Sequence, residues 1–104
     1  MEISFEKEYL FELYKTGKTA DNEHCFPPEV VERYCQTIDL LESVAIVEDL
    51  YRYQVLHYEE LQGDKEGLES VHLNDRYRLE FVSNRVVSET VVTVCDIIEF
   101  INPL

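Results

Sequence analysis

The first quarter of the chain shows two different spacings of its apolar residues. Residues 2–5 alternate polar and apolar side chains, which predicts a short edge strand. The next apolar stripe recurs at helical spacing and consists of Tyr9, Leu10, Leu13 and Tyr14. Gly17 follows this stripe and is a typical helix stop, so the spacing predicts a helix that ends there.

A longer helix is expected next. Pro27 and Pro28 suit a helix start, and one apolar face then continues to about Ser43 through Val31, Tyr34, Cys35, Ile38 and Leu41. A shorter helical piece is predicted over Ile46–Tyr53. It leads into a polar connector over residues 57–67.

The apolar spacing changes to two from Leu68 onward. Three segments rich in Val, Ile, Leu, Tyr and Phe are expected to be strands, namely Leu68–Leu73, Tyr77–Ser83 and Thr90–Ile98. Short polar stretches separate them, as in an antiparallel meander. One strand, two or three helices and three strands predict an α+β fold with the helices on one face of a small sheet. The length of 104 residues indicates a single domain over residues 1–104.

The first hairpin of this meander has a register that its own pattern selects. Opposite residues of an antiparallel pair face the same side, so pairing Leu73 with Tyr77 and Val71 with Leu79 makes one wholly apolar face. This pairing requires a loop over residues 74–76. The other face is then polar and contains Ser70, His72, Arg78 and Glu80, with His72 opposite Arg78. A guanidinium beside an imidazole suits a phosphodiester, because arginine offers a planar fork of donors and histidine titrates near neutral pH.

The charge of the chain argues against unaided capture of nucleic acid. Its 22 acidic and 9 basic side chains give a net charge of −13, which repels a polyanion at long range. The acidity is uneven, because residues 1–49 have a net charge of −8 and residues 62–85 only −1. A polyanion is therefore expected to contact the second half, whereas the acidic first half suits a basic partner.

The composition also bears on the cellular location and on disulfide or metal sites. No apolar run approaches the roughly 18 residues of a membrane span. The start, MEISFEKEYLFEL, lacks the order of a signal peptide, so a cytoplasmic location and no membrane contact are expected. The three cysteines are an odd number without a CxxC pair, which argues against a disulfide framework or a zinc ribbon. We expect no metal and no cofactor.

One block of the sequence resembles a known family. Residues 61–81, LQGDKEGLESVHLNDRYRLEF, are similar to the signature of RelE/ParE-superfamily toxins. The similarity is greatest to the HigB branch, with its Leu-Lys-Gly-Asp turn, Ser-x-Arg strand, Asn-Asp and Tyr-Arg. It continues in FEKEYLFELYKTGK at residues 5–18, LHYEE at 56–60 and VCDIIEF at 94–100. The resemblance covers nearly the whole chain.

This resemblance implies a microbial-RNase-like fold, with two or three helices packed on an antiparallel sheet. Members typically cleave mRNA in the ribosomal A site and are held inactive by an antitoxin encoded beside them, here a HigA-like helix-turn-helix protein. The ribosome brings the mRNA, so the toxin need not capture RNA by itself. The expected reaction is metal-independent attack of a ribose 2′-hydroxyl on the adjacent phosphate, which needs a base, an acid and nearby cations.

The family motif implies roles for residues of this chain. Arg78 matches the arginine of Tyr-Arg and is expected to hold the scissile phosphate. His72 stands where the family usually has arginine or lysine, and it could be base, acid or cation. Arg76 and Lys65, which lie in turns, are expected phosphate contacts, and Ser70 on the same polar face is an expected substrate contact.

The departures from the family predict a weak, altered or inactive nuclease. Gln62 replaces the lysine of the Leu-Lys-Gly-Asp turn, and His72 replaces the strand arginine. The family's C-terminal histidine and tyrosine are absent. Depending on the alignment, their positions hold Ile97 and Ile98, or Pro103 and Leu104. Asp96 and Glu99 are the ionisable groups left nearby.

Two classes of function stay open on this sequence. The first is a ribosome-dependent mRNA endoribonuclease that acts through the residues above. The second is a non-catalytic interaction protein of the same fold, which binds antitoxin or a protein target, as relatives in the ParE branch do with gyrase. Plainer interpretations also exist: Arg78 can simply pair with Glu80 or Glu69, and His72 can be an ordinary solvated strand residue. His57 can pack or cap.

Overall fold

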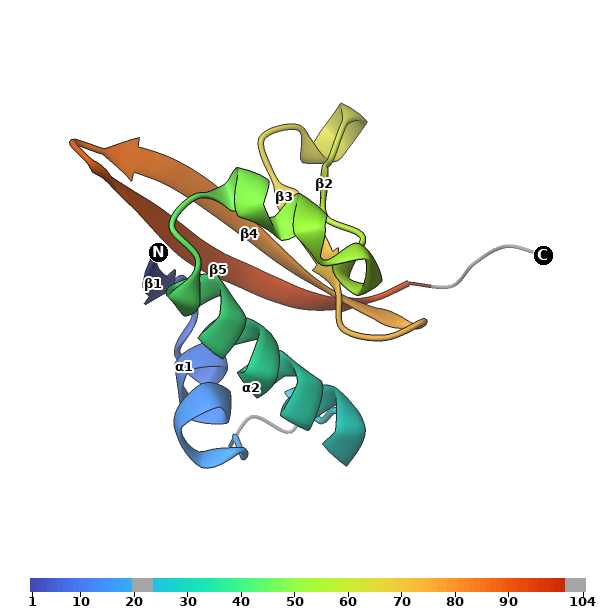
Figure 1. Cartoon of the computed structure of the whole chain (residues 1–104). Coiled ribbons are helices and arrows are strands. Elements are labelled where there is room, and N and C mark those ends of the chain that lie inside the picture. Colours follow the sequence, from blue (N-terminus) through green and yellow to red (C-terminus); the bar gives the residue numbers. More distant parts are fainter. Residues whose placement is uncertain (20–23, 101–104) are drawn as a thin grey trace.

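The computed structural model describes residues 1–19 and 24–100 and shows helices on one side of a twisted sheet (Figure 1). The predicted α+β class is confirmed. The two tail residues considered above, Pro103 and Leu104, lie outside the described residues. In chain order the elements are β1 (Glu2–Phe5), α1 (Glu8–Thr16), α2 (Pro28–Ser43), the 3₁₀ segments η2 (Val47–Arg52) and η3 (Gln54–Leu56), β2 (Glu59–Glu60), η4 (Gly63–Lys65), β3 (Glu69–His72), β4 (Tyr77–Val86) and β5 (Glu89–Glu99).

The helix boundaries follow the local signals in the sequence. Gly17 ends α1 with a φ of 74°, and its N–H donates to the carbonyl of Leu13 at 2.9 Å. A left-handed residue at this position is the usual role of glycine. Helix α2 begins at Pro28 and ends at Ser43, as predicted. The predicted short helical piece forms η2, which is a 3₁₀ segment rather than an α-helix.

The sheet is larger than the predicted three-stranded meander. Its strand order is β1-β5-β4-β3-β2, with β1 parallel to β5 and the other pairs antiparallel. The predicted connector over residues 57–67 contains β2 and η4, so that part of the prediction is wrong. Strand β2 consists of two exposed glutamates, so it has no alternation of apolar and polar residues that could predict it. Only its pairing with β3 makes it a strand.

The register of the β3–β4 hairpin is the predicted one. Val71 pairs with Leu79, and His72 pairs with Arg78. The Asn74 side chain holds the turn, because its Oδ1 accepts the backbone N–H groups of Arg76 and Tyr77, both at 2.8 Å. This turn therefore sets which side chains of the two strands share a face.

Strands β4 and β5 extend beyond their predicted ends. The polar residues 83–85 stay in β4, because β5 supplies backbone partners for them. A bulge lies near the middle of the pair, where Glu80 pairs with Asp96 but Phe81 pairs with Val94. One residue of β5, Cys95, is left over at this point, which bends the strand and increases its twist.

The hydrophobic core lies between the helices and one face of the sheet. Tyr34 of α2 is completely buried, and its hydroxyl donates to the carbonyl of Leu10 in α1 at 2.7 Å. This contact locks the two helices together over the sheet. The core includes Val30, Ile38, Leu41, Leu50, Leu56, Val71, Leu79, Phe81, Val92 and Val94. Ser70 and His72 of β3, and Arg78 and Glu80 of β4, alternate with these core residues and point to the opposite face of the sheet.

Candidate functional site

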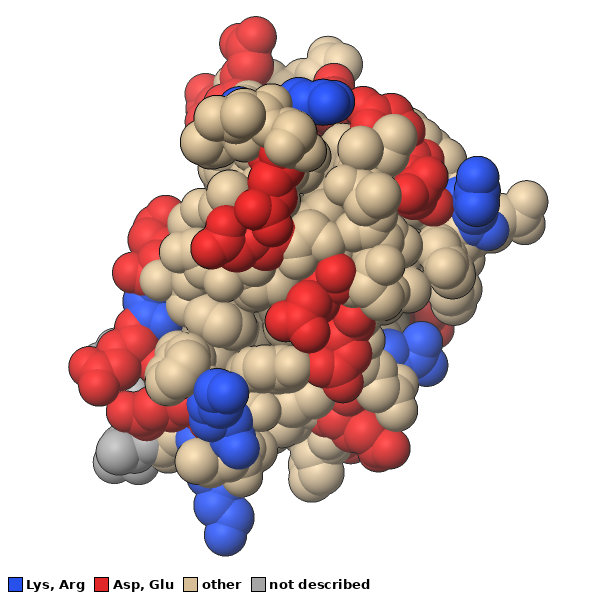
Figure 2. All heavy atoms as spheres, turned by 60° about the vertical axis from the view of Figure 1, so that its left-hand side comes forward, with Lys and Arg blue, Asp and Glu red and all other residues tan. Residues whose placement is uncertain are grey.

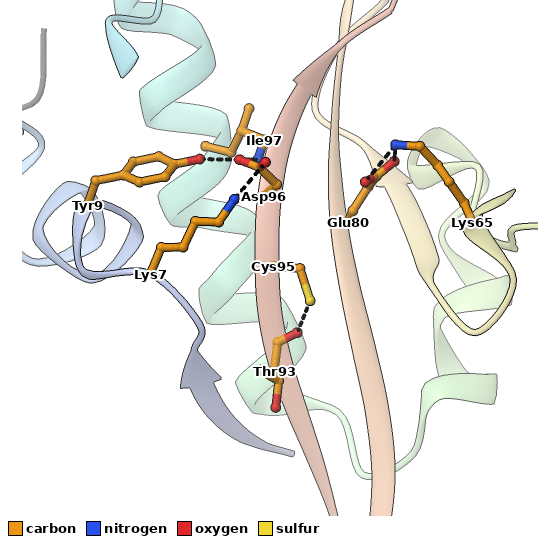
Figure 3. Close-up of polar contacts among 8 residues, drawn as sticks. All are labelled: Lys7, Tyr9, Lys65, Glu80, Thr93, Cys95, Asp96 and Ile97. Atoms are coloured by element: carbon orange, nitrogen blue, oxygen red, sulfur yellow. Dashed lines mark hydrogen bonds and ion pairs between the residues drawn. The ribbon is translucent and has the colours of Figure 1, made fainter. Parts of the chain in front are cut away.

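The polar face of β3 and β4 is organised around the carboxylate of Glu80. Lys65 of η4 donates to both of its oxygens, at 3.0 and 2.8 Å (Figure 3). Arg78 contacts the same carboxylate, with 3.0 Å between its Nη2 and Oε2. The side chain of Glu80 is only 4% exposed. Two of the predicted phosphate-binding cations therefore share one buried anion.

Arg78 is largely enclosed on this face. Its side chain is 21% exposed, and its Nε is buried without a hydrogen-bond partner in the described part of the chain. The guanidinium carbon lies 5.8 Å from the ring centroid of Phe100. Ser70 is fully buried, and its hydroxyl also has no partner among the described residues. The polar face is thus enclosed at these positions, where Lys65 contacts Glu80 and Phe100 lies beside Arg78.

His72 lies at the end of β3 between two aromatic rings. Its ring centroid is 4.6 Å from that of His57 and 5.0 Å from that of Phe100. Burial lowers the pKa of His72, and electrostatic interactions with His57 and Arg78 lower it further, against the opposing effects of Glu59 and Asp75. The lowered pKa favours the neutral imidazole at pH 7, which suits a proton acceptor better than a phosphate-binding cation.

Substituting His57 with asparagine should raise the pKa of His72. The change removes the electrostatic interaction with the His57 imidazole and exposes the His72 ring, and both effects favour the protonated form of His72. Asparagine tolerates the left-handed backbone of position 57, where φ is 47°. Titration of the imidazole C–H resonances by NMR measures the shift. His24→Asn is the control, because His24 stacks on Tyr9. An unchanged or lower pKa of His72 in H57N would contradict this electrostatic account.

A hollow of about 440 Å³ lies beside His72 at the end of the sheet. Arg76, an expected phosphate contact, lines it together with His72. Arg33 of α2 and His57 also line the hollow, although the sequence did not identify them as site residues. Nothing in the local sequence could identify Arg33, because α2 is far from β3 along the chain. The predicted residues thus divide into a Glu80 cluster, with Lys65 and Arg78, and this hollow, with Arg76 and His72.

The two acidic residues left near the missing histidine and tyrosine have other partners. Asp96 pairs with Lys7 at 2.9 Å and accepts a hydrogen bond from Tyr9. Burial opposes its ionisation, yet the bonds from Tyr9 and Lys7 hold the pKa of Asp96 below its usual value. In Figure 3 these contacts lie across β5 from Lys65 and Glu80. The side chain of Glu99 accepts a hydrogen bond from Tyr77, which raises the pKa of that phenol.

No three side chains of His, Cys, Asp or Glu are placed to hold a metal ion within residues 1–19 and 24–100. Over the same ranges, the helices are too short or too polar to cross a membrane.

Two solved structures have a fold similar to that of this chain. The chain resembles a YoeB/ParE toxin from Agrobacterium tumefaciens with a TM-score of 0.56 and 17% identity, over 97% of this chain and 100% of that one. It also resembles a histidine-to-glutamine variant of YafQ from E. coli, with a TM-score of 0.50 and 12% identity, over 94% and 91% of the two chains. The chain therefore has the fold of RelE/ParE-superfamily toxins, as the sequence block predicted. No protein-family model and no curated protein matches the sequence.

Proposed function

We propose that this chain is the toxin of a type II toxin–antitoxin pair, of the HigB-like branch, and acts in the cytoplasm as a ribosome-dependent mRNA endoribonuclease of reduced activity. The observation that carries the proposal is the gathering of Lys65, Arg78 and His72 on one face of a sheet with the RelE/ParE toxin fold. A HigA-like helix-turn-helix protein is the proposed antitoxin.

The proposed reaction uses the neutral imidazole of His72 as the base for the 2′-hydroxyl. Arg78 and Lys65 stabilise the charge that develops on the phosphate, and the exposed Arg76 contacts the neighbouring backbone. The rate is reduced for two reasons. Glu80 competes with the phosphate for both cations. No imidazole or phenol stands at Ile97 and Ile98, at the end of β5, to protonate the leaving oxygen.

Delivery by the ribosome agrees with the distribution of charge. Acidic side chains are spread over the face that Figure 2 presents, with basic ones scattered among them. Such a surface repels free RNA, and an mRNA that is already held in the A site removes the need for a long basic track. The same acidic surface suits a basic antitoxin, whose complex with this chain should weaken as salt rises.

Cleavage of ribosome-bound mRNA tests this function. With purified ribosomes and a programmed mRNA, we expect slow cleavage in the A site, and Arg78→Ala should slow it by about a hundredfold. Arg85→Ala is the matched control, because Arg85 is exposed near the far end of β4, and it should cleave like the unchanged chain. Equal rates for R78A and the unchanged chain would overturn the proposed role of Arg78.

A second function has one specific observation in its favour. Because Glu80 binds both Lys65 and Arg78, the face is already neutralised in part without substrate. A non-catalytic chain that binds antitoxin or a protein target fits this arrangement. Growth arrest on induction that persists in R78A without mRNA cleavage would favour this function over the nuclease.

A further inference from the structure

The hollow beside His72 collects nitrogen-bearing side chains from four separate segments. Arg33 comes from α2, His57 follows η3, His72 ends β3 and Arg76 lies in the β3–β4 turn. Asp75 of the same turn is the acidic residue in its lining. Segments that are distant in the sequence thus present donor groups to one volume of about 440 Å³.

The charge of this hollow is opposite to that of the chain. Two guanidinium groups and one carboxylate give its lining a positive charge, within a protein of net charge −13. Each imidazole can also donate an N–H when neutral. The larger hollow of about 650 Å³ is the reverse case, because its lining includes Glu48, Glu60, Glu66 and Glu69 and no basic residue. An anion is therefore favoured at the first hollow and repelled at the second.

A smaller hollow adjoins the first. It has a volume of about 150 Å³ and shares Arg33 and Val55 with its neighbour. Its lining adds Tyr53, Leu40 and Leu56. The Tyr53 side chain is 40% exposed, so a flat group can reach its ring. A ligand that spans both hollows needs an anionic end and an apolar, planar end.

We propose that the two hollows form a nucleotide site, with the phosphate between Arg33 and Arg76 and the base against Tyr53. Arginine forks suit phosphate oxygens, and aromatic stacking is tolerant of base identity. The nucleotide is either free or one unit of an RNA strand. The site rests on the proposed function where it shares His72 and Arg76 with the nuclease, whereas Arg33 and Tyr53 take no part in the proposed cleavage. It extends the proposed nuclease by a contact on a flanking nucleotide.

Binding of adenosine 5′-monophosphate, followed by calorimetry and NMR, tests the site. We expect it to bind more tightly than inorganic phosphate and to shift resonances of the two hollows. Arg33→Gln and Arg76→Gln should each weaken binding by about tenfold, as expected for one lost hydrogen bond between charged groups. Both arginines are exposed, so the fold should tolerate either change. Arg85→Gln makes the same charge change outside the hollows and should leave the affinity unchanged.

The outcomes separate this site from the nuclease. Equal weakening by R85Q, or equal affinity for inorganic phosphate and the nucleotide, would overturn the site. A short single-stranded RNA that binds more tightly than the nucleotide would identify an RNA strand as the ligand, and equal affinities would identify a free nucleotide; each supports the site. A chain that binds the nucleotide at these residues but cuts no mRNA keeps the site and loses the proposed function. A chain that cuts mRNA but binds no nucleotide keeps only the function.

Discussion

Replacing Glu69 with alanine should lower the free energy of unfolding by about 3 kcal/mol. Glu69 is 7% exposed, and its Oε1 accepts the hydroxyl of Tyr58 at 2.5 Å. Its Oε2 accepts the backbone N–H of Ser83 at 2.8 Å and the hydroxyl of the same residue at 2.7 Å. One carboxylate thus joins β3 to β4 and to the segment before β2. Alanine leaves all three donors without this acceptor.

The stability lost with these three hydrogen bonds should exceed the stability gained by removing a buried charge. Hydrogen bonds to a charged group contribute about 1.5–3 kcal/mol each, and donors left unpaired in a protein interior add a further penalty. Burial and the bond to Glu69 raise the pKa of Tyr58, so its hydroxyl remains a neutral donor over the whole range of ordinary pH. Glu69→Gln keeps an acceptor at this point and should lose less than Glu69→Ala.

Urea unfolding followed by circular dichroism measures the fall in the free energy of unfolding of Glu69→Ala. A fall in Tm of about 15 °C should accompany it. Glu60→Ala is the matched control. Glu60 pairs with Glu69 across β2 and β3 but is exposed, so its loss should stay within about 0.5 kcal/mol. Equal losses for the two variants would contradict the prediction. They would mean that water from the adjoining hollow of about 650 Å³ replaces the carboxylate.

The register of β3 and β4 could be predicted because burial on one face leaves no choice. A shift of one residue would turn Val71 and Leu79 away from the core, where both are completely buried. The positions of His72 and Arg78 on the other face then follow from alternation alone. The same argument identifies which residues share a face, but it says nothing about what covers them.

The side chains that enclose the polar face of β3 and β4 could not be predicted, because their positions depend on the path of a loop. Gly63 and Gly67 have φ values of 70° and 95°, which let residues 61–68 turn and bring Lys65 back onto Glu80. Phe100 lies beside Arg78 on this face, and its N–H donates to the carbonyl of Arg76 at 2.7 Å. Such contacts join segments that are distant in the sequence, and the local spacing of apolar residues does not predict them.

The parallel pairing of β1 with β5 has the same origin. The alternation of residues 2–5 indicates a strand, but a strand of four residues carries no information about its partner. Its neighbour is β5, where Ile3 pairs with Val92 and Phe5 with Val94. The length and the buried face of β5 decide this pairing, and both belong to the far end of the chain.

Replacing Glu80 with glutamine should raise the rate of mRNA cleavage by about tenfold, if the proposed nuclease is limited by its cations. In the unchanged chain the carboxylate binds Lys65 at 2.8 Å and Arg78 at 3.0 Å. Glutamine has nearly the same shape and keeps one acceptor, but it lacks the charge that holds both cations. The side chain is only 4% exposed, which also keeps Glu80 from a direct role as base for a substrate hydroxyl.

The ribosome assay described above measures this gain, and Glu66→Gln is the control for the change in net charge, because Glu66 is exposed beside the same loop. The double variant E80Q/R78A should not show the faster cleavage, because the freed guanidinium of Arg78 is the cause of the increase. A fall in rate with Glu80→Gln would instead make the carboxylate a part of the catalytic centre. An unchanged rate would mean that the missing acid at the end of β5, and not the pairing of Lys65 and Arg78, limits the enzyme.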